Sequence, residues 1–271
     1  KIKSGGEFVF KRFLRLYPIF WVCILITFTI TTVFSPGFDR SIKDFILSFT
    51  MIPSLLGAKA VDGVYWSLVP ELFFYGMMLI IYLSNSTKNV LYIGFTWLLL
   101  IGLNSIFNFP TSVQTIFNLK WGMLFLIGIN FYQIFIGKSD WKNHFQILLS
   151  LGITFLFEDF LFPYFLILFI AVFYLFVYQK LSFLAIPPLM FLGRISYAFY
   201  LLHQFIGYTI QYNLIKYGVM DFWILIIVPI IISLILSYFV TDFIEKPIIK
   251  YGNQWYKSRR ILNTKSVDFK N

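Results

Sequence analysis

The sequence predicts an all-α protein, a polytopic bundle of about eight transmembrane helices. Hydrophobic residues make up 59% of the 271 residues and charged residues only 13%, against about 45–50% and about 25% in soluble domains. The apolar residues also fall into runs of about the length of a membrane span. So few charges exclude a water-soluble domain, and the high hydrophobicity excludes a disordered chain.

The candidate spans follow from the thickness of the bilayer. A helix that crosses about 30 Å of hydrocarbon needs about 20 mainly apolar residues. The segments that meet or approach this length are 16–34, 64–83, 89–107, 119–136, 145–157, 161–179, 192–213 and 222–244. The fifth is short, and an acidic turn at 158–160 separates it from the sixth. Segment 41–57 is too short and polar to span, and Pro53 interrupts it, so we expect an interfacial or re-entrant helix there.

The distribution of cations predicts the orientation. With both termini in the cytoplasm, 17 of the 22 lysines and arginines lie on the cytoplasmic side, as the positive-inside rule requires. The other five are Arg40, Lys43, Lys59, Lys120 and Lys216. The net charge of +10 is therefore explained by cytoplasmic loops and anionic membrane lipid rather than by nucleic acid. We expect a multi-pass protein of the plasma membrane.

The chain divides by composition into two parts. Residues 1–245 form the integral membrane domain, and residues 246–271 form a basic cytoplasmic tail that lies on the membrane surface or is disordered. The chain starts at Lys1 with a loop-like segment that has no signal peptide core, so we expect its true N-terminus to lie upstream. One cysteine and two histidines are too few to suggest a metal site, and we expect neither a metal nor a bound cofactor.

A basic cluster marks the cytoplasmic end of the first span. Lys11, Arg12 and Arg15 lie within one arc of a helix at about 100° per residue. Such cations suit the phosphates of a nucleotide-like donor, because the arginine fork binds phosphate through two hydrogen bonds. The alternative is that they are topology anchors, which are expected at a cytoplasmic helix end.

The second polar feature is Glu71, within the span at 64–83. It lies four residues after Ser67, on the same helix face. An intramembrane carboxylate is a candidate base, acid or acceptor for a sugar hydroxyl. The alternative is a glutamate that is hydrogen-bonded to a neighbouring helix. We expect Pro70 to kink or to start the helix near Glu71.

The third feature is a polar stripe on the span at 192–213. Its members lie within an arc of about 100° and are Gly193, Ser196, Tyr200, His203, Gln204, Gly207 and Gln211. Such a stripe on an apolar helix is expected to face a cavity or another polar helix. For His203 alone, an interhelical hydrogen bond is an equally good interpretation. The other histidine, His144, lies in a cytoplasmic connection and is expected to anchor it at the interface.

Taken together and in this order, these stretches resemble the membrane-bound acyltransferase family 3. The resemblance rests on FKRFLRLYP at 10–18, YWSLVPELFFY at 65–75, LGRISYAFYLLH at 192–203 and FIEKP at 243–247. It covers essentially the whole chain. Because the family has about ten spans, it implies that two spans precede the eight seen here.

The resemblance implies an activity and a set of site residues. Family members move an acyl group, commonly acetyl, from a cytoplasmic thioester to a hydroxyl of an exported glycan or small molecule. The acyl donor implied here is acyl-CoA, a co-substrate, and the basic cluster is implied to bind it. Glu71 and His203 are the implied supporting catalytic residues. The implied pocket residues are Trp66, Ser67, Tyr75, Arg194, Ser196, Tyr197 and Tyr200.

Two departures from the family pattern matter. The family's principal catalytic histidine follows an arginine by about ten residues on its first span, and neither His203 nor His144 matches it. The resemblance therefore implies that the chain as it stands is inactive. The second departure is Val69-Pro70, where many members carry a more polar pair before the glutamate.

Two other functions remain open at this stage. A polytopic exporter of a polysaccharide or lipid-linked glycan would use the same polar stripe to line a pathway, although no internal repeat is visible. A structural membrane subunit without a site would show only a loss of stability when Glu71 and His203 are both replaced.

Overall fold

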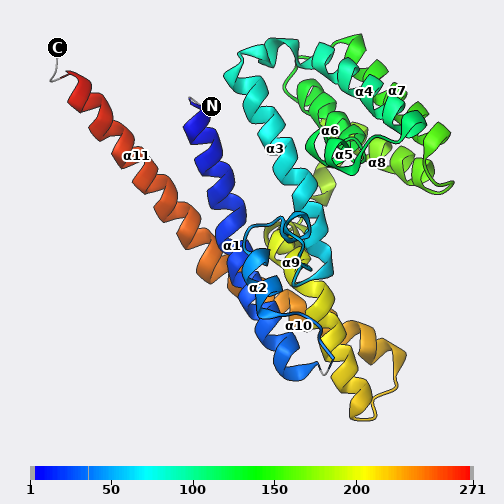
Figure 1. The fold of residues 1–271 in the computed structure, drawn as a ribbon, viewed down its shortest axis with the longest axis vertical. Helices are drawn as coiled ribbons and strands as arrows, with labels where there is room; N and C mark the ends of the chain where they lie inside the picture. The colour runs from blue at the N-terminus through cyan, green and yellow to red at the C-terminus, as the bar shows by residue number, and fades with distance from the viewer. Residues whose placement is uncertain (1–3, 36, 269–271) are drawn as a thin grey trace. The chain divides into compact units, whose positions relative to one another are not determined.

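The computed structural model describes residues 4–35 and 37–268, and side chains as far as Arg259. The described residues form helices and connecting turns without a β-strand, so the predicted all-α fold is confirmed (Figure 1). The α-helices are α1 (Gly5–Phe34), α2 (Ile42–Ser48), α3 (Leu68–Leu83), α4 (Val90–Phe107), α5 (Thr111–Ile116), α6 (Gly122–Phe135), α7 (Trp141–Phe157), α8 (Phe162–Val177), α9 (Pro187–Lys216), α10 (Phe222–Val240) and α11 (Lys246–Asp268).

Each predicted span coincides with one of these helices. Among the described residues, four helical stretches are long and apolar enough to cross a membrane by themselves: Gly5–Phe34, Gly63–Leu83, Ser86–Phe107 and Phe222–Arg259. Two shorter apolar helices, Gly122–Phe135 and Phe162–Val177, accompany them. These helices agree with a membrane bundle, while the count of eight spans and the cytoplasmic termini stay predictions.

The chain forms two compact units, which are described separately. We call residues 70–189 the middle unit, and residues up to 69 together with those from 190 onward the terminal unit. The predicted membrane domain is thus interrupted, in sequence, by a segment that forms its own core. Helices α1, α2, α9, α10 and α11 belong to the terminal unit, and helices α4 to α8 belong to the middle unit.

The middle unit is held together by an apolar core and a chain of buried amides. Asn130 on α6 donates to Gln146 Oε1 on α7 at 3.0 Å, and Asn143 donates to Asn130 Oδ1 at 2.9 Å. Gln146 in turn donates to the carbonyl of Leu91 on α4 at 2.6 Å. All three amide side chains are fully buried, so these bonds join three helices where no water competes.

A close contact at the start of α6 gives a test of this packing. A Cβ at Gly122 would lie 2.7 Å from Cζ2 of Trp97, whereas a Cβ at Gly128 on the same helix would meet nothing within 4 Å. We expect Gly122→Ala to lower the free energy of unfolding by about 1–3 kcal/mol through overpacking. Gly128→Ala is expected to be neutral or slightly stabilising. Thermal unfolding of both variants in detergent checks this, and equal midpoints would contradict the packing.

In the terminal unit, α11 packs against the first half of α1. Gly252 lies against Leu14, with the nearest Leu14 carbon 2.6 Å from where a Cβ would sit. Phe10 stacks on Tyr256 with ring centroids 4.8 Å apart. The tail is helical up to Asp268, and it continues α10 through a π-helical turn, Thr241–Glu245. Figure 1 shows α11 leaving the bundle beside α1.

The segment between α1 and α3 folds back along α1. Trp21 Nε1 donates to the carbonyl of Phe49 at 3.0 Å, and Tyr17 OH donates to that of Thr50 at 3.4 Å. Trp21 lies about 20 Å before the end of α1 at 1.5 Å per residue. The segment therefore runs back along about half of α1, and the interfacial and re-entrant interpretations of 41–57 both stay predictions. Pro53, which was expected to interrupt the segment, begins a 3₁₀ turn after α2 ends.

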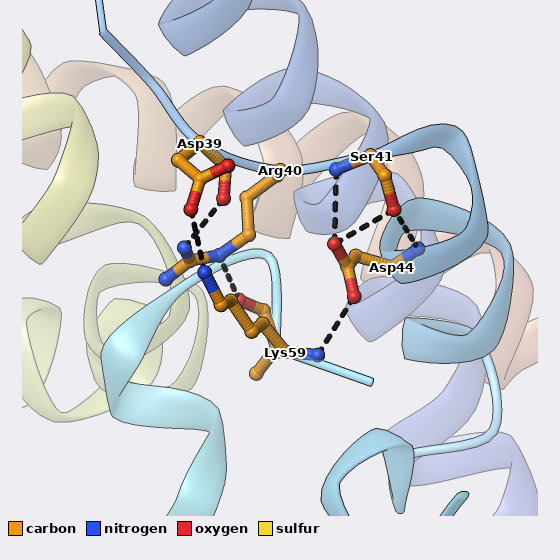
Figure 2. Close-up of polar contacts among 6 residues, drawn as sticks. Asp39, Arg40, Ser41, Asp44 and Lys59 are labelled. Atoms are coloured by element: carbon orange, nitrogen blue, oxygen red, sulfur yellow. Dashed lines mark hydrogen bonds and ion pairs between the residues drawn. The ribbon is translucent and has the colours of Figure 1, made fainter. Parts of the chain in front are cut away.

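A set of polar contacts, shown in Figure 2, closes the outer part of this segment. Asp44 caps α2 by accepting the amide of Ser41 at 2.9 Å, and it also accepts the amide of Lys59 at 2.8 Å. Lys59 Nζ pairs with Asp39 at 2.5 Å. Arg40 donates to the carbonyl of Ala60 at 2.7 Å. These bonds hold the two ends of the segment at 39–60 together, and we call them the loop clamp.

Candidate functional site

The polar stripe of α9 is the centre of the candidate site in the terminal unit. Tyr200 OH lies 2.5 Å from Ser67 Oγ and donates to the carbonyl of Val64 at 2.8 Å. Both partners belong to the 3₁₀ turn Gly63–Ser67 that precedes α3. The structure therefore brings together two motifs that are more than 130 residues apart in the sequence.

His203 lies one turn further along α9, with one ring nitrogen close to two backbone carbonyls. Its Nδ1 is 2.9 Å from the carbonyl of Tyr200 and 3.2 Å from that of Phe199. A carbonyl oxygen only accepts hydrogen bonds, so Nδ1 must donate. In the neutral ring, Nε2 then keeps its lone pair and is the nitrogen available to a ligand or to a hydroxyl proton.

A cavity of about 320 Å³ lies between α9 and α10 beside His203. Four members of the polar stripe line it: His203, Gln204, Gly207 and Gln211. Ser233 of α10 lines the opposite wall. Part of the stripe thus faces a cavity, as expected. The other members lie outside it, and Ser196, an implied pocket residue, is exposed with its hydroxyl donating to the carbonyl of Gly193.

Gln211 has a role that the sequence did not reveal. Pro229 has no N–H to donate to the carbonyl of Leu225, four residues earlier on α10. Gln211 Nε2 donates to that carbonyl at 2.9 Å. Pro229 therefore leaves an acceptor on α10 that joins the two helices through Gln211.

Asp62 is a further residue of the site that sequence analysis missed. It is fully buried, and its carboxylate accepts the amide of Val64 at 3.2 Å and that of Phe205 on α9 at 3.0 Å. It thereby fixes the 3₁₀ turn to α9 two residues after His203. In the sequence, Asp62 is an acidic residue just before a predicted span. Such a residue is interpreted as an ordinary loop charge unless its burial is known.

Other predicted pocket residues have structural partners. Tyr197 OH donates to the carbonyl of Leu16 on α1 at 3.2 Å. Arg194 Nε lies 4.0 Å from Asp242, which Lys246 approaches at 2.6 Å. Trp66 remains 54% exposed. None of the three predicted residues Tyr197, Arg194 and Trp66 lines the cavity beside His203.

Glu71 and Tyr75 belong to the middle unit and are paired with each other. Tyr75 OH donates to Glu71 Oε1 at 2.5 Å, one helical turn away on α3. Helix α3 begins at Leu68, so Pro70 lies in its first turn, where its missing N–H costs little. Pro70 therefore helps to start the helix rather than to kink it, and its carbonyl accepts from Asn118 at 3.2 Å.

The basic cluster lies on the first half of α1. Lys11 forms an ion pair with Glu7 at 2.7 Å, and Arg12 lies 5.4 Å from the ring centroid of Phe8. Arg15 is exposed and is close enough to Glu245 to interact with it electrostatically. Of the three cations, Arg15 therefore lies nearest to the π-helical turn.

The electrostatics of the loop clamp predict how the segment responds to acid. Hydrogen bonds from the amides of Ser41 and Lys59 lower the pKa of Asp44 to about 2. Because this pKa is depressed below its unfolded value of about 3.9, the stabilisation is complete above about pH 4 and is lost as the pH falls toward 2. Hydrogen exchange at these two amides, corrected for the intrinsic rate, should accelerate only in that window. Acceleration already near pH 6 would contradict the clamp.

The other histidine has local partners of its own. His144 in the middle unit bonds Tyr174 OH through Nδ1 at 2.7 Å and Ser139 Oγ through Nε2 at 3.1 Å. Both of its nitrogens are thus used in packing. Within the described parts of the chain, no group of three or more potential ligand residues is arranged to hold a metal ion.

Comparison with known proteins identifies the family. A search of curated proteins and a search of solved structures each found no match. The family model Acyl_transf_3, described as an acyltransferase domain, matches residues 1–241. Because this match covers most of the chain, including α1, the 3₁₀ turn and α9, the chain belongs to the membrane acyltransferase family 3.

Proposed function

We propose that this membrane acyltransferase is an O-acyltransferase that moves an acyl group, acetyl in the first instance, from acyl-CoA to a hydroxyl of a cell-surface glycan. The family membership supports acyl transfer in general. The donor, the acceptor and the location in the plasma membrane are the parts proposed here. In the reaction, the hydroxyl oxygen attacks the thioester carbonyl and its proton passes to a base. The C–S bond then breaks, and the thiolate of CoA takes up that proton and leaves as the thiol.

The observation that carries this proposal is the state of His203. Its Nδ1 faces backbone carbonyls of the same helix, to which it can only donate. Its ring lines the cavity between α9 and α10. A neutral imidazole with a free Nε2 lone pair can accept a hydrogen bond from an acceptor hydroxyl and orient its oxygen for attack. This is a supporting role, since His203 does not correspond to the family's first-span histidine, and the proposed transfer needs a principal base besides His203. We assign Glu71, paired with Tyr75, a second supporting role on α3.

The proposed donor site is the basic cluster on α1. The phosphates of CoA carry several negative charges, and Lys11, Arg12 and Arg15 project from one side of a helix whose N-terminal end is expected in the cytoplasm. Of the three, Arg15 is the best placed to act on a ligand. It is exposed, and among the described residues it has no close ion pair comparable to that between Lys11 and Glu7.

Replacing Arg15 tests the donor site. We expect Arg15→Ala to weaken acyl-CoA binding by about tenfold or more, because a charge-assisted hydrogen bond contributes about 1.5–3 kcal/mol. Binding of radiolabelled acetyl-CoA to membranes measures this at matched expression. Lys43→Ala is the control, since Lys43 is an exposed cation in the outer loop. Unchanged donor affinity in Arg15→Ala would remove Arg15 from the site.

The alternative function is export of a polysaccharide or lipid-linked glycan. The cavity between α9 and α10 is the feature that an exporter would also need. The two functions differ in a covalent product. An acyltransferase leaves an alkali-labile acyl ester on the glycan, whereas an exporter changes only the amount of glycan at the surface.

A further inference from the structure

The middle unit contains an apolar groove of about 340 Å³ between α3, α4 and α6. Its lining residues fall within 74–81 of α3, 90–100 of α4 and 126–129 of α6, together with Phe117. The described lining residues are hydrophobic apart from Gly94 and Thr96. The buried side chains of Trp97 and Leu126 belong to its inner wall. The groove is therefore a concave surface for an apolar occupant.

The few polar side-chain groups in the wall are already used inside the protein. Thr96 Oγ1 donates to the carbonyl of Tyr92 at 3.3 Å, and Trp97 Nε1 donates to that of Phe117 at 2.8 Å. Water stays in a cavity only where it finds about two to four polar partners. An empty groove would forfeit dispersion contacts along its walls. The walls therefore favour hydrocarbon over both water and a void.

The length and position of the groove fit one leaflet of the bilayer. Its lining on α4 runs from Val90 to Leu100, which is about 15 Å at 1.5 Å per residue and half of the hydrocarbon thickness of about 30 Å. Helix α3 ends at Leu83 and α4 begins at Val90, so the turn at 84–89 lies at one end of the groove. The charge distribution predicts that this turn is cytoplasmic.

Two lysines lie at this cytoplasmic end. Lys88 is exposed in the turn at 84–89. Lys142 at the start of α7 reaches the same end, because its Nζ lies 3.3 Å from the hydroxyl of Tyr92 in the first turn of α4. Asp140 approaches Lys142 only at 4.0 Å. This end of the groove therefore presents positive charge at the level where anionic headgroups gather.

We propose that the groove, with Lys88 and Lys142, binds one anionic phospholipid of the cytoplasmic leaflet. One acyl chain lies along α3, α4 and α6, and the phosphate is held by the two lysines. The apolar walls select a hydrocarbon chain, and the charge at the end selects the headgroup. This site goes beyond the proposed acyl transfer, because the lipid is neither the donor nor the acceptor.

Native mass spectrometry of the purified full chain tests the site without relying on activity. Delipidated protein in detergent is titrated with dioleoyl phosphatidylglycerol, which is anionic, or with dioleoyl phosphatidylcholine, which has the same chains but no net charge. We expect one phosphatidylglycerol to bind about 30-fold more tightly than phosphatidylcholine, because each lysine near an anionic headgroup strengthens binding about fivefold.

Lysine variants test the headgroup end of the site. The double variant Lys88→Ala with Lys142→Ala should weaken binding of phosphatidylglycerol about 30-fold and leave that of phosphatidylcholine unchanged. Lys180→Ala is the matched control. Lys180 is an exposed cation that follows α8 in the same unit, and α8 packs against α6 and α7. Its replacement should change the affinity for neither lipid.

Tryptophan variants test the groove itself. Thr96 lines the groove and is exposed, so Thr96→Trp should place a large ring where the acyl chain lies. We expect it to weaken binding of both lipids about tenfold or more, because loss of about two buried methylene groups already has that effect. Leu99→Trp puts the same ring on an exposed part of α4 outside the groove and should change neither affinity.

Two results would overturn the proposal. Equal affinity of the wild-type protein for the two lipids would mean that ordinary annular lipid alone covers this surface. Equal binding of phosphatidylglycerol by Thr96→Trp and Leu99→Trp would mean that no acyl chain occupies the groove. The lysine variants change only exposed or half-exposed side chains, so their result does not depend on whether the tryptophan variants fold.

Discussion

Asp62→Ala is expected to be among the most destabilising single substitutions in the terminal unit. The buried carboxylate accepts two backbone amides, from Val64 and from Phe205 on α9. Removing it breaks both hydrogen bonds, including the one that joins the 3₁₀ turn to α9, at about 1–3 kcal/mol each. We therefore expect a loss of about 2–5 kcal/mol in the free energy of unfolding, measured by thermal or denaturant unfolding in detergent.

A matched aspartate provides the control for this prediction. Asp39 is exposed, and its ion pair with Lys59 lies at the surface of the loop clamp. Asp39→Ala should cost less than about 1 kcal/mol, as exposed pairs do. Asp62→Asn should fall between the two, since one amide oxygen remains to accept. If Asp62→Ala and Asp39→Ala have equal effects, then Asp62 does not join the 3₁₀ turn to α9.

His203→Ala is expected to have the largest effect on acyl transfer. Loss of one hydrogen bond to a reacting hydroxyl corresponds to about a 10- to 100-fold fall in kcat/KM. Stability should change little, because the ring bonds only carbonyls of its own helix among the described residues. The measurement is the rate of transfer from labelled acetyl-CoA to glycan in native membranes, with donor binding determined in parallel.

The second histidine is the control. His144→Ala removes a ring that bonds Tyr174 and Ser139 in the middle unit, so it should lower stability while leaving kcat/KM of the remaining folded protein unchanged. A supporting catalytic role for His203 requires that donor binding also stay unchanged in His203→Ala. Transfer at the wild-type rate in that variant would refute the supporting catalytic role of His203.

Helix positions were predictable because apolar periodicity and length are local properties of the sequence. Each predicted span overlaps a helix, and the short helix α2 lies within segment 41–57, where an interfacial or re-entrant helix was expected. The helical tail was harder to predict. Its stability depends on Gly252 and Tyr256 packing against α1, and such contacts between distant segments leave no pattern in a polar, basic stretch.

The candidate site was predictable only in part. The polar stripe of α9 follows from spacing alone, and four of its members line the cavity. Asp62 escaped notice because its importance comes from burial rather than from residue type or spacing. Gln211 was included in the stripe, but its partner, the carbonyl that Pro229 leaves free, becomes apparent only when α9 and α10 lie together.

Chemical analysis of the cell-surface glycan distinguishes an O-acyltransferase from an exporter. Glycan is purified from cells with and without the protein, quantified, and examined by mass spectrometry before and after mild alkali. We expect an alkali-labile acyl ester that depends on the protein, with an unchanged amount of glycan at the surface. Unchanged acylation together with a fall in surface glycan would contradict this expectation and identify an exporter.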